Sequence, residues 1–105
     1  RRRYLSENGW RITEEAVLKE GKFLYTVMEV YYEPEHPRLA PGECYFPGAL
    51  LENPSHMVPA YFALVKKGLE ITLAHQADAE KQVALDYLNA LAADPNLSFL
   101  AEVKS

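Results

Sequence analysis

The longest run of β-forming residues in the chain extends from Lys22 to Glu33 and reads KFLYTVMEVYYE. Aromatic and β-branched residues are typical of strands, and successive side chains of a strand point to opposite faces. One face would carry Phe23, Tyr25, Val27 and Tyr31, and the other Leu24, Met28, Val30 and Tyr32. Because both faces are apolar, the pattern predicts a strand that is central in its sheet or covered on both sides.

The segment before this strand allows two interpretations. Thr13, two glutamates and the closing Gly21 have the N-cap, acidic first turn and C-terminal glycine of a short helix over 13–20. A hairpin with a two-residue Glu20-Gly21 turn fits equally well. Its cross-strand pairs would be Leu18 with Phe23, Ala16 with Tyr25 and Trp10 with Tyr31. The pattern leaves both structures open.

Six of the seven prolines lie between Pro34 and Pro59, together with two glycines. Proline and glycine disfavour regular structure, so residues 34–57 are predicted to form a long proline-rich loop. Long loops in small domains are usually functional or disordered. The apolar residues within this one predict that part of it packs onto the domain: Tyr45, Phe46, Leu50 and Leu51.

In the second half of the chain, segments with apolar residues at helical spacing alternate with segments in which every second residue is apolar. Apolar residues at helical spacing predict a helix over 58–67, ended by Gly68, and a second over 78–93, capped by Asp78. Alternating residues predict strands at 69–74 and 98–103. The expected fold is a single α+β domain over 1–105, with a small sheet of about three to five strands, two packed helices and the long connector.

Composition and charge narrow the class of protein. The chain has 105 residues, 49% of them hydrophobic and 25% charged, which is typical of one soluble globular domain. A net charge of −4 disfavours extensive nucleic-acid binding, and no apolar run is long enough to cross a membrane. The basic run Arg1–Arg3 predicts a solvated, flexible end over 1–8. A single cysteine suggests a reducing, cytoplasmic location.

Candidate chemistry centres on Cys44, His36 and His56, which lie in or beside the connector. Their spacing matches no zinc motif, and the dispersed glycines form no phosphate-binding loop, so no metal, cofactor or catalytic residue is predicted. A small enzyme or ligand-binding protein that uses Cys44 with one of the histidines is the alternative.

Aromatic pairs flank or occupy the connector and favour a different class of function. Tyrosines supply large contact areas at low entropic cost, and prolines stiffen a loop before it docks. We therefore expect a non-catalytic interaction module, such as an inhibitor, immunity-type or adaptor protein, that binds a partner protein through residues 34–59 and the adjacent tyrosines. The predicted contact residues are Tyr31, Tyr32, His36, Tyr45 and Phe46. A structural subunit that self-associates through an edge of the long strand, and so forms a homo-oligomer, is a further alternative.

Overall fold

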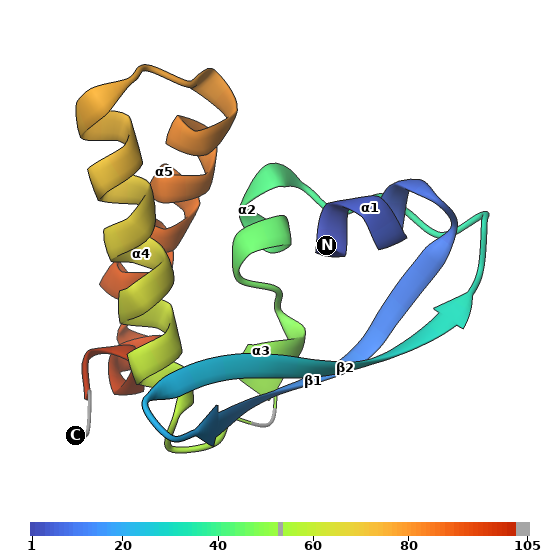
Figure 1. Ribbon diagram of the computed structural model, residues 1–105, viewed down its shortest axis with the longest axis horizontal. Coiled ribbons are helices and arrows are strands. Elements are labelled where there is room, and N and C mark those ends of the chain that lie inside the picture. The colour runs from blue at the N-terminus through green and yellow to red at the C-terminus, as the bar shows by residue number, and fades with distance from the viewer. Residues whose placement is uncertain (53, 103–105) are drawn as a thin grey trace.

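A two-stranded hairpin packs against a group of helices in the computed structural model, which describes residues 1–52 and 54–102 (Figure 1). The elements, in chain order, are α1 (Arg2–Glu7), β1 (Trp10–Glu20), β2 (Phe23–Tyr32), α2 (Pro41–Tyr45), α3 (Ala49–Glu52), α4 (Val58–His75), α5 (Ala79–Ala93) and the 3-10 helix η1 (Pro95–Ala101). The protein is therefore an α+β domain, as predicted.

The segment before the long strand is a strand, so the helical interpretation of 13–20 is wrong and the hairpin is right. Its turn is Gly21-Lys22, one residue later than expected, and Leu18 lies opposite Tyr25 instead of Phe23. Gly21 has φ +60, which suits the first central position of a type II′ turn. A bulge at Thr13 shifts the pairing again, so Trp10 lies opposite Tyr32.

The sheet has two strands in the described part of the chain, fewer than the three to five expected. The predicted strand at 69–74 is the second half of α4, and residues 98–101 of the other belong to η1; residue 103 lies outside the described residues. Gly68 does not end the helix, because it lies within α4 and lacks the positive φ of a helix-ending glycine. Leu69, Ile71 and Leu73, which suggested alternation, belong to the second half of α4, in which only Leu69 is buried.

The connector contains two short helices, contrary to the expected loop over 34–57. Pro41 is the first residue of α2, where its fixed φ favours a helix and its missing N–H costs nothing. Gly42 then allows α2 to approach α5, because a Cβ at this position would lie 2.4 Å from the Tyr87 ring. The Tyr87 hydroxyl also donates to the Phe46 carbonyl oxygen at 3.2 Å.

The helix α5 matches the prediction closely. Asp78 precedes it with extended backbone, and its carboxylate accepts a hydrogen bond from the Lys81 N–H at 3.0 Å. Helix α4 lies beside α5, and α2 packs against α5 on the side that faces α1 (Figure 1). None of the described helices has the length and apolarity needed to cross a membrane.

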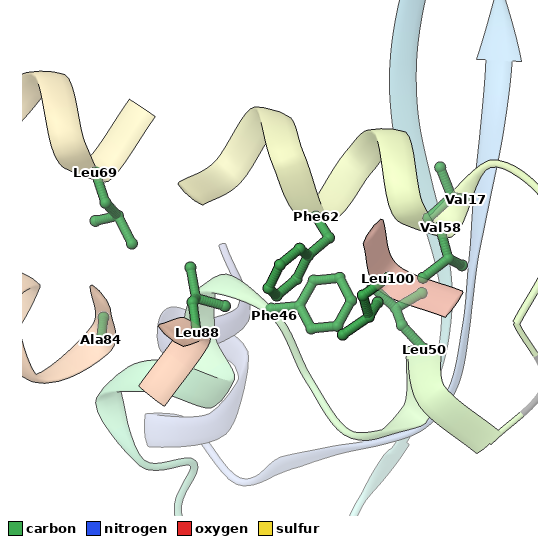
Figure 2. Packing of buried hydrophobic residues seen from close by; sticks show 9 residues of the cluster. All are labelled: Val17, Phe46, Leu50, Val58, Phe62, Leu69, Ala84, Leu88 and Leu100. Carbon is green, nitrogen blue, oxygen red and sulfur yellow. The ribbon is translucent and has the colours of Figure 1, made fainter. Parts of the chain in front are cut away.

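The core joins the hairpin to the helices (Figure 2). It contains side chains from β1, the connector, α4, α5 and η1: Val17, Phe46, Leu50, Val58, Phe62, Leu69, Ala84, Leu88 and Leu100. Phe46 packs edge-on against Phe62, with ring centroids 5.1 Å apart. The prediction that part of the connector packs onto the domain is confirmed, since Phe46 and Leu50 are fully buried.

Candidate functional site

The predicted contact residues divide into two groups. Tyr31 and Tyr32 are exposed at the end of β2, and His36 follows them at the start of the connector. The Tyr32 ring packs edge-on against the Trp10 ring, with ring centroids 5.3 Å apart. Arg11, which lies opposite Tyr31, pairs with Glu33 at 3.2 Å and closes this end of the hairpin.

The second group, Tyr45 at the end of α2 and Phe46 directly after it, faces the interior. Phe46 is 0% exposed, between Tyr61 and Phe62, and so cannot contact a partner in this fold. Tyr45 is half-buried. The expectation for Phe46 is wrong because a short helix, which the prolines concealed, turns its ring into the core.

Arg2 connects the inner face of the hairpin, which carries the buried residues Glu15 and Val17, to the helices. Its Nε donates to both carboxylate oxygens of Glu15, at 3.0 and 2.9 Å, and Nη1 donates to the Cys44 carbonyl oxygen at 3.0 Å. Nη2 donates to the Tyr61 hydroxyl at 2.9 Å. Burial alone would lower the pKa of Arg2, but its hydrogen bonds to Glu15 and Tyr61 raise it overall. Arg2 thereby connects α1 to β1, to the connector and to α4.

The opposite, outer face of the same hairpin is uncovered. The register places Leu18 beside Tyr25 and Ala16 beside Val27 on this face, with Phe23 next to the turn. These apolar side chains remain open to solvent, with exposed fractions of 40% for Leu18, 69% for Phe23, 42% for Tyr25 and 50% for Val27. We call these residues, with Ala16, the apolar half of the outer face. The expectation that the long strand is covered on both sides is wrong.

The outer face becomes acidic toward the bulge. Glu14 lies directly opposite Glu29, and like charges in this position repel. The Thr13 hydroxyl donates to a Glu29 carboxylate oxygen at 3.2 Å and so fixes that side chain. The charge of Glu29, with a hydrogen bond to it and a weaker effect of Glu14, raises the pKa of the neighbouring Tyr31 phenol. This acidic half of the outer face therefore has a negative potential.

An open recess of about 630 Å³ adjoins the acidic half. It is lined by Thr13, Glu14, Glu15, Ala16, Val27, Met28, Glu29, Ala49 and Glu52. Arg2 neutralises Glu15, but none of the ion pairs within the described residues includes Glu14, Glu29 or Glu52. The recess therefore extends the negative potential from the sheet toward α3.

Cys44 lies in a different environment from that of a catalytic thiol. It lines a recess of about 210 Å³ with Arg3, Glu7, Glu80 and other residues, none of them histidine. Burial raises the pKa of the Cys44 thiol, although Arg3 acts in the opposite direction. A thiol that stays protonated is a poor nucleophile. In the described part of the chain, no three His, Cys, Asp or Glu side chains are grouped to hold a metal ion.

Comparison with known proteins adds no functional assignment, because no protein-family model, curated protein or solved structure matches the chain. The alternation along β2 predicts that Phe23, Tyr25 and Val27 share one face, but it also predicts that both faces of the strand are covered. The signal that could have separated the faces was charge, since the opposite face of β1 carries Glu15, for which the chain offers a basic N-terminal partner.

Proposed function

We propose that this protein is a non-catalytic binding module that docks a partner protein on the outer face of its hairpin. The observation that carries the proposal is the apolar half of that face, in which Leu18, Phe23, Tyr25 and Val27 are each at least 40% exposed. Contiguous exposed apolar patches on single domains commonly mark binding sites, and tyrosine and phenylalanine are enriched in interfaces.

The charges around the patch specify the chemistry of the partner. Glu14 and Glu29 repel each other across the strands, and a lysine or arginine placed between them would relieve that repulsion. The net charge of −4 adds a long-range attraction for positive surfaces. The partner surface is therefore an apolar patch with basic residues beside it, as expected for the target of a small acidic inhibitor, immunity-type or adaptor protein.

The connector has a supporting role in this proposal. Phe46 and Leu50 pack beneath the inner face, and Arg2 fixes that face through Glu15. A rigid backing holds the outer side chains in place before binding, which lowers the entropic cost of docking. Tyr31, Tyr32 and His36 extend the proposed contact surface at the far end of β2, while the buried Phe46 is not part of it.

The test compares matched variants in affinity capture. The tagged full chain and three variants are incubated with lysate of the source cell, and the captured proteins are quantified at low and moderate salt. Phe23→Ser with Tyr25→Ser removes the apolar half, and Glu14→Gln with Glu29→Gln removes the acidic half. Leu64→Ser, at an exposed position on α4, is the control.

We expect one stoichiometric partner that the wild type and Leu64→Ser capture equally. The Phe23→Ser, Tyr25→Ser variant should bind the purified partner at least about tenfold more weakly, because central aromatic residues dominate interface energies. The glutamine variant should lose most of the salt dependence. A folded Phe23→Ser, Tyr25→Ser variant with unchanged affinity would exclude this surface.

A further inference from the structure

The outer edge of β2 is an unpaired strand edge. Its only neighbour in the sheet, within the described residues, is β1. In an antiparallel pair, alternate residues of an edge strand direct their backbone N–H and C=O groups away from the partner strand. The ten-residue β2 therefore presents a row of hydrogen-bonding groups that another strand could join.

The two strands differ in how their edges are protected. Natural edge strands avoid pairing through charged residues, proline or bulges. β1 contains five charged residues and the bulge, and α1 and α3 pack against it. β2 contains one charged residue, Glu29, and neither proline nor glycine, and among the described elements it makes extensive contact only with β1.

The inner face of β2 is also incompletely buried. Glu15 and Val17 of β1 are buried on this face, whereas their neighbours on β2 are only partly covered: Leu24, Thr26, Met28 and Val30. A strand added beside β2 would cover the exposed sides of these four residues. On the side away from β1, β2 therefore lacks both backbone hydrogen-bond partners and neighbouring side chains among the described residues.

We propose that a second copy of this chain occupies the edge, with the two β2 strands antiparallel about a two-fold axis at Val27. This register places Tyr25 opposite Glu29 of the second copy and Phe23 opposite Tyr31, so no like charges meet. Leu24 lies opposite Val30 on the inner face. The result is a four-stranded sheet with the charged, bulged β1 at both outer edges, so assembly stops at the dimer.

The dimer goes beyond the binding of a different protein, because it uses the edge of β2 and leaves the outer face free. Val27→Lys and Ala16→Lys separate the two surfaces. Both positions are exposed on the outer face and lie directly opposite each other, but only position 27 is on β2, the strand whose edge forms the proposed contact. The two variants also change the net charge equally.

Sedimentation equilibrium of the full chain, over micromolar to millimolar concentrations, provides the test. The wild type should approach twice the monomer mass. Val27→Lys should raise the dissociation constant at least about tenfold, because it places two lysines opposite each other. Ala16→Lys should change it less than about threefold, since Ala16 lies one strand away from the edge. Mixing Val27→Lys with Val27→Glu should restore the dimer, while Val27→Glu alone stays monomeric.

Four outcomes would overturn the proposal. A wild type that remains monomeric excludes the dimer without any variant. Equal loss of association in Val27→Lys and Ala16→Lys would show that the outer faces stack, and unchanged association in both would place the contact elsewhere. A mixture of folded Val27→Lys and Val27→Glu that stays monomeric would refute the Val27 register. Circular dichroism confirms folding of each variant.

Discussion

The two faces of the hairpin come from the same two strands but differ in what covers them. On the inner face, Glu15 and Val17 are buried against helices and the connector. On the outer face, Phe23 and Tyr25 are open to solvent. Both faces of β2 are apolar in sequence, so hydrophobicity does not account for the difference.

The two faces differ in the specific contacts that their side chains make with the rest of the chain. Arg2 reaches Glu15 from α1 and also binds the connector and Tyr61, so it selects the face that meets the helices. If the hairpin presented its other face to the helices, Glu15 would point to solvent and the buried Arg2 would lose its partner. One buried ion pair can therefore decide which of two apolar faces is left for binding.

The largest effect should come from Phe46→Ala, in the core beneath the inner face. Phe46 is fully buried against Phe62 and Tyr61, and truncation of such a ring leaves a cavity. We expect the free energy of unfolding to fall by about 3–5 kcal/mol, measured by urea denaturation. A loss below about 1 kcal/mol would mean that Phe46 is not a core residue.

Arg2→Met tests the contact that selects the inner face. Removal of the guanidinium leaves the Glu15 carboxylate buried without its partner, so we expect a loss of about 3 kcal/mol in urea denaturation. Arg3→Met is the matched control, because Arg3 pairs with Glu80 at the surface and should contribute less than about 1 kcal/mol. Equal effects of the two substitutions would contradict the role given to Arg2.

Phe23→Thr tests the outer face, where the side chain is 69% exposed. Threonine keeps strand propensity and loses little burial, so the free energy of unfolding should change by no more than about 0.5 kcal/mol. Thermal and urea unfolding provide the measurement. A loss comparable to that of Phe46→Ala would indicate that the chain itself covers the outer face.

The smallest effect concerns Cys44, whose carbonyl belongs to the Arg2 contact. Because burial raises the pKa of the thiol, less thiolate is present near neutral pH and alkylation should be slower than in the urea-unfolded chain. The rate should increase as the pH rises toward the raised pKa. Alkylation in the native state that is faster than in the unfolded chain would restore the thiol-enzyme hypothesis.

Local signals in the sequence determined several elements. The β-forming run after Gly21 predicted β2, and Asp78 with an apolar stripe predicted α5, because caps and strand propensity act within a few residues. The apolar residues of the connector predicted that Phe46 and Leu50 pack inward. The net charge of −4 disfavoured broad nucleic-acid binding, and the aromatic pairs around the connector suggested an interaction module; both stay predictions.

Tertiary structure decided the remaining features, because each depends on a contact distant in sequence. Residues 69–74 alternate like a strand, yet they continue α4 because Leu69 packs into a core that includes α5. The packing of α1 on the hairpin involves the contact of Arg2 with Glu15, and the position of α2 depends on Gly42 meeting Tyr87. Periodicity reports which side chains share a face, but only packing determines which face is covered.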